Sequence, residues 1–298
     1  MKIFTGSSNQ TLVKKIAKEL KIKLGKIELS RFANGEARVW IKDDVVDKKA
    51  IVVQSFSSPP DEYLMEFCLI CDALKRLGVK KIIAVIPWLG YCVQDKVFRP
   101  GEPLSSKVIA KILQSFKIDQ LITLDLHNET IAGFFDFSFS HLSAVPVFVD
   151  YFIENKVQID SVISPDIGAV KKASAFARAL NLPLSVINKK RNLVTGKVSI
   201  LGVSDEVKGK KVLIVDDFIS TGGTLIKTAH FLKEKGVKEV YAAITHHFYV
   251  HSVQEKVDKS QLDKLFVTDT IAPPKSMKSK KLKIISVSKL LANVLKSC

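Results

Sequence analysis

The chain has 298 residues, 47% of them hydrophobic, and carries a net charge of +16 at neutral pH. This length suits two globular domains of about 150 residues each, and no apolar run approaches the roughly 20 residues that a membrane-spanning helix needs. The charge raises nucleic acid as a partner, but the lysines are scattered and form no recognition motif. A solvated basic surface that attracts polyanionic small molecules is the better account.

The first half of the chain predicts strands that alternate with helices. KIFTGSS is typical of a strand, and Asn9 or Ser8 can cap a helix that runs to about Leu20. The next elements, in chain order, are a hairpin in IELSRFANGEARVWI, a strand in KKAIVVQSF, a helix after SSPPDE, a strand in KKIIAVIPWLGY, a helix capped by Ser105 or Ser106, and a strand in DQLITLDLH. This alternation predicts an α/β fold with a mainly parallel sheet between two layers of helices.

The second half repeats this order of elements. It predicts a strand in DSVISPDIGAV, a helix in KKASAFARAL, a strand in LSVINKKR, an irregular or β-hairpin segment from Lys197 to Gly209, a strand in KVLIVDD, a helix in TLIKTAHFLKEKG, strands in KEVYAAITHHF and LDKLFVTDT, and a strand followed by a helix in KIISVSKLLANVL. We place the boundary near Pro146, which gives domains at residues 1–145 and 146–298. The last helix is a candidate to pack back on the first domain.

Cys68 and Cys71 have the C-x-x-C spacing of a redox motif or of half a zinc site. They fall on one helical face with Leu64, Phe67 and Leu74, and no second cysteine pair follows them. Core packing therefore explains this pair better than chemistry does.

The stretch from Lys211 to Thr224 points to a phosphorylated sugar as ligand. The apolar run Val212–Val215 predicts a buried strand, and the carboxylates of Asp216 and Asp217 follow it directly. Backbone amides near glycines, side-chain hydroxyls and the positive end of the next helix suit a phosphate, while the two acids can accept hydrogen bonds from ribose hydroxyls. The residues of this predicted loop are Ser220, Thr221, Gly222, Gly223 and Thr224. An ordinary strand, turn and helix would not need so many polar groups together.

This stretch resembles the signature with which phosphoribosyltransferase-fold proteins bind phosphoribosyl diphosphate. Further, RFANGE, LGYCVQDK, DLHNETIAGFFD, SPDIGAV, NKKR and VDDFISTGGT occur in the order and approximate spacing of the ribose-phosphate diphosphokinase family. The resemblance extends from Lys2 to the last predicted helix. It implies two tandem phosphoribosyltransferase-like domains, of which the first carries the ATP side and the metal-binding histidine and the second carries the ribose 5-phosphate loop.

The resemblance also implies a reaction. In this family ribose 5-phosphate attacks the β-phosphorus of ATP through its anomeric hydroxyl, which gives phosphoribosyl diphosphate and AMP. Lys189 and Arg191 in NKKR match the family's catalytic lysine and arginine at the base of a flexible loop. Cations that close over the nucleotide would stabilise the charge that develops on the phosphoryl oxygens. A basic strand end exposed to solvent is the alternative interpretation.

Mg²⁺ is the cofactor that the resemblance implies. His127 resembles the family's Mg²⁺-contacting histidine with Asp125 beside it, and Asp166 resembles an acid that binds a second Mg²⁺ near the ribose. Asp136 matches a further acid often assigned to the metal. Imidazole is an unusual ligand for this hard cation, so His127 is expected to act together with the ATP phosphates. A hydrogen-bonded loop histidine and a helix cap at Asp166 are the alternatives.

The nucleotide side is the most unusual part of the resemblance. Val93 stands where the family usually has an arginine that contacts ATP, which removes an interaction of about 1.5 to 3 kcal/mol. Weaker ATP binding, compensation by a lysine such as Lys96, or impaired catalysis could each follow. The residues that resemble the adenine-recognition hairpin and the ATP-binding segment are Phe32, Asn34, Glu36, Gln94 and Asp95. In homo-oligomeric relatives this hairpin reaches into the active site of a neighbouring subunit.

Three functions remain open at this point. The first is an active ribose-phosphate diphosphokinase, which we expect to be cytoplasmic because Met1–Gly6 has no secretory leader, and to be a homo-oligomer without nucleic-acid or membrane partners. The second is a catalytically silent homologue that acts as a regulatory subunit, for which Val93 is the best argument. The third is a phosphoribosyltransferase or a sugar-phosphate-responsive nucleic-acid binder.

Overall fold

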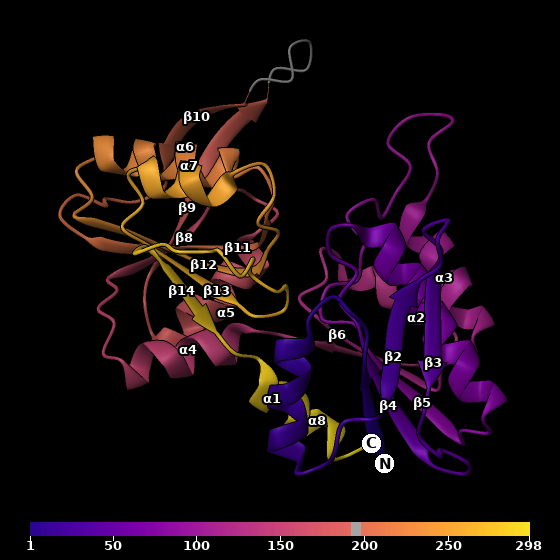
Figure 1. The fold of residues 1–298 in the computed structure, drawn as a ribbon. Helices are drawn as coiled ribbons and strands as arrows, with labels where there is room; N and C mark the ends of the chain where they lie inside the picture. Colours follow the sequence, from indigo (N-terminus) through magenta and orange to yellow (C-terminus); the bar gives the residue numbers. More distant parts are fainter. Residues whose placement is uncertain (192–197) are drawn as a thin grey trace. The chain divides into compact units, whose positions relative to one another are not determined.

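The computed structural model describes residues 1–191 and 198–298 and divides into two compact units (Figure 1). The first unit comprises residues 1–143, 270–272 and 286–298, and the second comprises residues 144–269 and 273–285. The first break lies within two residues of the boundary expected near Pro146. The second domain, expected to reach residue 298, instead ends at residue 285, because the C-terminal helix belongs to the first unit.

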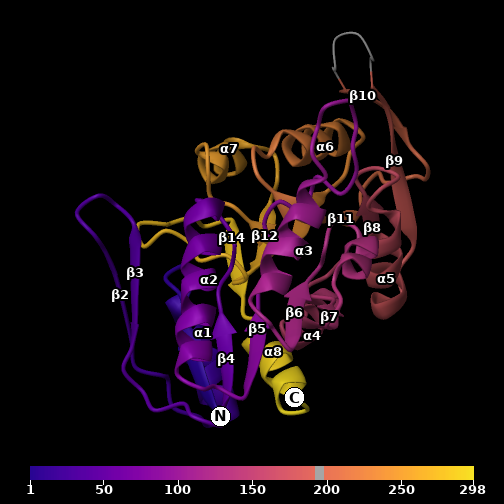
Figure 2. The same cartoon turned by 90° about the vertical axis from the view of Figure 1, so that its right-hand side faces the viewer.

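The first unit is built on a parallel five-stranded sheet in the order β1-β4-β5-β6-β7. Its strands are β1 (Lys2–Thr5), β4 (Lys49–Val53), β5 (Lys81–Val85), β6 (Gln120–Leu124) and β7 (Ser138–Leu142), and the antiparallel hairpin is β2 (Ile27–Arg31) with β3 (Ala37–Ile41). Its helices are α1 (Gln10–Leu20), α2 (Pro60–Arg76), α3 (Ser105–Ser115), the 3₁₀ helix η1 (Glu129–Phe134) and α8 (Ser288–Leu295). Figure 2 shows the hairpin extending beside α2.

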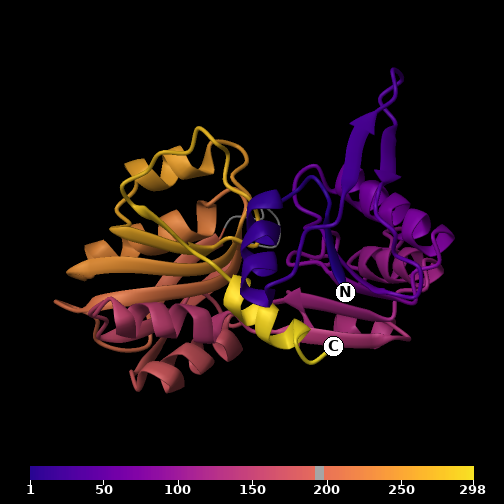
Figure 3. The same cartoon turned by 60° about the horizontal axis from the view of Figure 1, so that its bottom comes forward.

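Local sequence signals explain where some of these helices begin. The Asn9 side chain accepts a hydrogen bond from the Leu12 amide at 3.1 Å, so Asn9 is the cap of α1. The expected serine cap of α3 is wrong: Ser105 is already the first helical residue, the capping position is Leu104, and no side chain caps it. The Ser105 hydroxyl instead bonds the Gln94 side chain at 2.5 Å. Figure 3 shows that α8 runs beside α1.

The second unit contains a seven-stranded sheet in the order β10-β9-β8-β11-β12-β13-β14. The strands are β8 (Ser161–Ser164), β9 (Leu184–Arg191), β10 (Val198–Val203), β11 (Lys211–Ile219), β12 (Glu239–His247), β13 (Lys264–Thr268) and β14 (Leu282–Ile285). The helices are α4 (Val145–Glu154), α5 (Val170–Leu180), α6 (Gly223–Glu234) and α7 (Val253–Lys259). Figure 1 shows α6 and α7 on one face of this sheet and α4 and α5 on the other.

The segment after NKKR is a β-hairpin in its described part, because β10 pairs antiparallel with β9. Residues 192–197, which include the expected start of this segment at Lys197, lie outside the described residues, and so does the Arg191 side chain. The other strand pairs of this sheet are parallel, so the carboxyl ends of β8, β11 and β12 meet at one edge. Loops at that edge of a parallel sheet are the usual place for ligand sites.

Strand alternation fixes the direction of each side chain at this edge. Val212 and Ile214 of β11 pack in one core cluster with Leu225 and Ala229 of α6. Since successive side chains of a strand point to opposite faces, Asp216 shares the α6 face with them, and Asp217 points toward α4 and α5. The two adjacent acids therefore point to opposite sides of β11 near its carboxyl end, the edge of the sheet at which the loop to α6 begins.

Candidate active site

The predicted sugar-phosphate loop links the end of β11 to the start of α6. Helix α6 begins at Gly223 directly after the loop, and no side chain caps its first turn. Gly222 has a φ of 76°, which side chains disfavour, and a Cβ there would lie only 2.9 Å from Val253 Cγ2. Thr221, Gly223 and Thr224 are exposed. An uncapped helix start with exposed hydroxyls and a glycine is suited to bind a phosphate.

Asp216 belongs to a charged cluster on the α6 face. Burial raises the pKa of Asp216 to about 6, the Asp217 amide opposes this rise through a 2.8 Å hydrogen bond, and the carboxylates of Asp217 and Asp166 add to it. Lys189 Nζ lies 4.0 Å from Asp166 Oδ2, and the lysine side chain is only 14% exposed. Burial lowers the pKa of Lys189, and the charges of Asp166 and Asp216 partly offset that effect. The structure thus brings the predicted catalytic lysine to two of the predicted site acids.

Asp166 holds the turn that leads into α5. Its Oδ1 accepts a hydrogen bond from the Ala169 amide at 3.1 Å, and the Ser164 hydroxyl donates to its backbone oxygen at 2.7 Å. The capping position of α5 is Ala169, without a side-chain cap, so Asp166 organises the preceding turn and is not the helix cap. Its side chain remains 47% exposed.

Asp217 pairs with a lysine that the sequence did not single out. Lys172 Nζ of α5 lies 2.5 Å from Asp217 Oδ1 and 3.5 Å from the Thr245 hydroxyl of β12. The exposed fractions of the Lys172 and Asp217 side chains are 13% and 22%, so this ion pair is mostly screened from solvent. A signal was available: Lys172 lies four residues before the buried Phe176, on the edge of the apolar stripe of α5.

In the first unit, the predicted ATP segment is bonded to the loop that follows β6. The side-chain Nδ2 of Asn128 donates to Asp95 Oδ2 at 2.5 Å, and the Gln94 side chain accepts from the Ser105 hydroxyl. His127, next to Asn128, is exposed, whereas Asp125 is only 5% exposed. The structure therefore joins Asp95 to the metal-histidine loop and leaves the imidazole of His127 accessible.

The predicted adenine-recognition residues occupy the tip of the β2–β3 hairpin. The Phe32 amide donates to the Glu36 carbonyl at 2.9 Å, and the Asn34 side chain accepts from the Glu36 amide at 3.2 Å. The Phe32 ring is 53% exposed, and the Arg38 guanidinium lies 5.8 Å from its centre. An aromatic ring presented in this way offers a flat apolar surface on which a base can stack.

Comparison with known proteins assigns the chain to a protein family. Residues 1–116 match the N-terminal domain of ribose phosphate pyrophosphokinase, and residues 151–274 match the phosphoribosyl transferase domain. A ribose-phosphate pyrophosphokinase of Fusobacterium nucleatum is 39% identical over 99% of this chain and 94% of its own length. The chain belongs to the ribose-phosphate pyrophosphokinase family. Pyrophosphokinase is another name for diphosphokinase, so the family inferred from the motifs is confirmed.

Further relatives support the same assignment over the whole fold. The ribose-phosphate pyrophosphokinase of Bacillus caldolyticus is 37% identical over 99% of this chain and 93% of its own length. The crystal structure of phosphoribosylpyrophosphate synthetase from Mycobacterium smegmatis matches with a TM-score of 0.92 and 33% identity, over 99% of this chain and 97% of that one. The expected fold of two phosphoribosyltransferase-like domains with helix-flanked parallel sheets is thereby confirmed.

The candidate metal residues of this chain fit Mg²⁺ only in a site where few protein ligands bind the ion and water and substrate fill the other positions. Within residues 1–191 and 198–298, no three His, Cys, Asp or Glu side chains converge as a ready metal cage. Mg²⁺ normally uses one or two carboxylates and completes its shell with water and substrate phosphates. The half-exposed Asp166 and the exposed His127 fit that use, while the buried Asp125 fits it less well.

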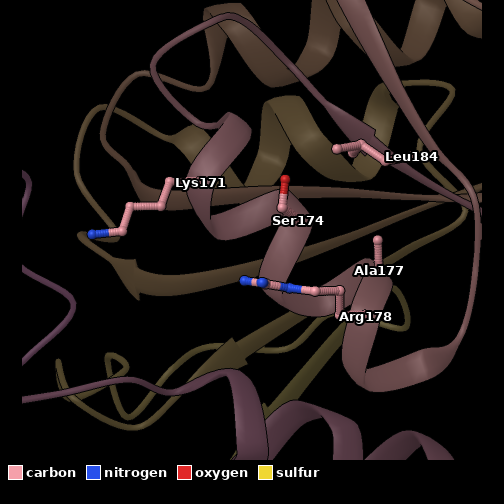
Figure 4. Close-up of a pocket in the computed structure, with 5 residues that line it drawn as sticks. All are labelled: Lys171, Ser174, Ala177, Arg178 and Leu184. Atoms are coloured by element: carbon pink, nitrogen blue, oxygen red, sulfur yellow. The ribbon is translucent and has the colours of Figure 1, made fainter.

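Two other features lie apart from these residues. A hollow of about 500 Å³ beside α5, shown in Figure 4, contains none of the predicted site residues and is lined by Lys171, Ser174, Ala177, Arg178 and Leu184. Cys68 and Cys71 are buried in α2, and burial raises the pKa of Cys68 to about 12. This pKa keeps the Cys68 thiol protonated and inert, in agreement with a packing role.

Proposed function

We propose that the chain is an active, Mg²⁺-dependent ribose-phosphate diphosphokinase that uses ATP and ribose 5-phosphate. The anomeric oxygen attacks the β-phosphorus of ATP, and the new O–P bond forms as the bond to the oxygen bridging the α-phosphorus breaks. AMP leaves with that electron pair, and the anomeric hydroxyl releases its proton. The observation that carries the proposal is similarity to ribose-phosphate pyrophosphokinases over 99% of the chain, together with an uncapped helix start at the sugar-phosphate loop.

Each group of residues has a separate role in this proposal. The loop from Ser220 to Thr224 binds the 5-phosphate through its amides and hydroxyls, and Asp216 and Asp217 accept hydrogen bonds from the ribose hydroxyls. Lys189 and Arg191 stabilise the charge that develops on the transferred group. The hairpin residues Phe32, Asn34 and Glu36 recognise the adenine of ATP. Gln94 and Asp95 belong to the segment that binds ATP.

The metal residues of the proposal are Asp166, His127 and Asp125. Mg²⁺, when bound, supplies positive charge to the phosphate oxygens and orients them for transfer. The accessibility of Asp166 and His127 supports this role, as does the family's use of a nucleotide whose phosphates can complete the coordination shell.

Formation of AMP and phosphoribosyl diphosphate by the purified protein tests the activity. We expect both products in equal amounts with Mg²⁺, ATP and ribose 5-phosphate, loss of activity with a chelator, and recovery on addition of Mg²⁺. Val93, 38% exposed in the predicted ATP segment, is the argument for a silent regulatory homologue, but the similarity to ribose-phosphate pyrophosphokinases over 99% of the chain does not favour that candidate. That candidate predicts ribose 5-phosphate binding by calorimetry without any product.

We also propose a cytoplasmic homo-oligomer in which the hairpin completes the ATP site of a neighbouring subunit. Exposure of Phe32 and Trp40 on this hairpin, 53% and 54%, supports an interface there. Among the described helices, none combines the length and apolar character needed to span a bilayer. Light scattering of the Trp40→Lys variant tests the interface: dissociation with a raised KM for ATP is expected, and an unchanged mass and KM would contradict it.

A further inference from the structure

The segment between β12 and α7 contains an unusual backbone. Tyr249, His251 and Ser252 all have left-handed conformations, with φ of 57°, 52° and 52°, although none of them is glycine. Such conformations are costly for side chains and persist only where the surrounding structure enforces them. We call residues 247–253 the β12–α7 turn. The contacts that stabilise the backbone conformation of this turn also show which neighbouring part of the protein the turn supports.

His247 fixes this turn from the end of β12. Its side chain is fully buried, and its Nδ1 accepts a hydrogen bond from the Tyr249 amide at 2.9 Å. Because Nδ1 accepts, the ring proton lies on Nε2, which donates to Gln254 Oε1 at 3.1 Å. The rings of His247 and Tyr249 stack with centres 3.9 Å apart. The imidazole therefore ties the backbone of the turn to the first turn of α7.

A second set of contacts anchors Gln254 from its other side. The Gln254 amide nitrogen donates to Asp258 Oδ1 at 2.9 Å and lies 3.2 Å from the Ser279 hydroxyl. The Ser279 hydroxyl in turn donates to Asp258 Oδ1 at 2.6 Å. Gln254 is 4% exposed, so these bonds are shielded from water. This network fixes Gln254 and, with it, the adjacent Val253.

The β12–α7 turn supports the sugar-phosphate loop directly. Val253 is fully buried, and its Cγ2 occupies the space where a Cβ of Gly222 would lie, at 2.9 Å. The Phe248 amide donates to the Ile219 carbonyl at 3.1 Å, just before Ser220. Val253 thus packs against the glycine of the sugar-phosphate loop, and the Phe248 hydrogen bond fixes the residue that precedes the loop.

From these contacts we propose that His247 is a positioning residue that holds the sugar-phosphate loop in its binding geometry through Gln254 and Val253. The proposal rests on the function proposed above and adds to it a residue outside the ligand shell. His247 touches no substrate in this role. It sets the position of Gly222, and through it the direction of the amides that receive the 5-phosphate.

Three substitutions of His247 separate the two hydrogen bonds. His247→Asn retains an acceptor near the Nδ1 position, His247→Gln retains a donor near the Nε2 position, and His247→Ala retains neither. Removing buried hydrogen bonds that orient the loop should raise the Kd for ribose 5-phosphate roughly tenfold in His247→Ala and less in the other two. Calorimetry with ribose 5-phosphate alone measures this Kd without any turnover.

The kinetic prediction is selective for one substrate. KM for ribose 5-phosphate should rise with its Kd, while KM for ATP stays within about twofold and kcat changes little. His230→Ala is the matched control, because His230 lies on α6 of the same unit with its side chain 61% exposed. Equal effects on both substrates, or an unchanged Kd in folded His247→Ala, would show that His247 is only structural.

If His247→Ala does not fold, Val253→Ala tests the same link between His247 and the sugar-phosphate loop. Loss of the Val253 methyl group that packs on Gly222 should weaken ribose 5-phosphate binding several-fold in the folded protein, and the melting temperature should fall by only a few degrees because one small side chain is shortened. An unchanged Kd in this variant would overturn the proposal. If the wild type binds ribose 5-phosphate but forms no product, the proposed activity fails and the positioning role of His247 stands.

Discussion

At the scale of single residues, Lys189 is the most direct test of the transfer step. It is 14% exposed, and its amine faces Asp166 at 4.0 Å. Because we expect its charge to act on the transferred group, Lys189→Ala should lower kcat about a hundredfold or more and change the Kd for ribose 5-phosphate little. Steady-state kinetics and calorimetry measure both, with the exposed Lys208→Ala as control. An unchanged kcat would remove Lys189 from the mechanism.

The ion pair of Lys172 with Asp217 gives a second prediction at this scale. Without the ammonium group, a mostly buried carboxylate loses its partner, so Lys172→Met should raise KM for ribose 5-phosphate and lower stability. A double-mutant cycle with Asp217→Asn should give a coupling energy of about 1 to 3 kcal/mol. Lys171→Met is the matched control, since Lys171 is the exposed neighbour on α5. Additive effects in the cycle would show that the pair is not coupled.

At the scale of elements, the link between β11 and α6 depends on Gly222. Gly222→Ala combines a disfavoured φ of 76° with a contact of 2.9 Å to Val253, so it should weaken ribose 5-phosphate binding at least about tenfold. Gly209→Ala separates the two causes, because Gly209 has a φ of 73° and open space around it. A ribose 5-phosphate Kd that moves equally in both variants would indicate general backbone strain.

The elements also show what the sequence could and could not predict. The β-branched run before Asp216 and the asparagine before α1 are local signals, and both predicted correctly where an element lies. The cap of α3 was mispredicted because Ser105 is used by Gln94, eleven positions earlier in the chain. Lys172 was missed because its position beside the apolar stripe of α5 does not identify its partner, Asp217, which lies on another element. The sequence predicts features that depend on neighbouring residues, such as strand positions and the cap of α1. It does not predict which side chains from different elements pair in the folded protein.

At the scale of the whole molecule, His247 makes stability depend on pH. Burial lowers the pKa of His247 from 6.5 to about 4, so between these values the unfolded chain binds a proton that the folded chain does not. Stability is therefore lost as pH falls from 6.5 toward 4, and His247 should contribute a loss of about 2 kcal/mol between pH 7 and pH 5. Urea unfolding at the two pH values should show this loss in the wild type and a smaller one in His247→Gln. An equal loss of stability between pH 7 and pH 5 in the wild type and in His247→Gln would show that protonation of His247 does not cause the loss.

The assignment of α8 to the first unit has a consequence for how the protein is made. Leu291, Ala292 and Leu295 of α8 are buried in a unit whose other elements come from the first half of the chain. The ribosome delivers α1 early and α8 late, after the entire second unit has been translated. The second unit can therefore acquire its core during synthesis, while the first must wait with the α8-facing surface of α1 uncovered. Nascent chains stalled before α8 should expose that surface to chaperones.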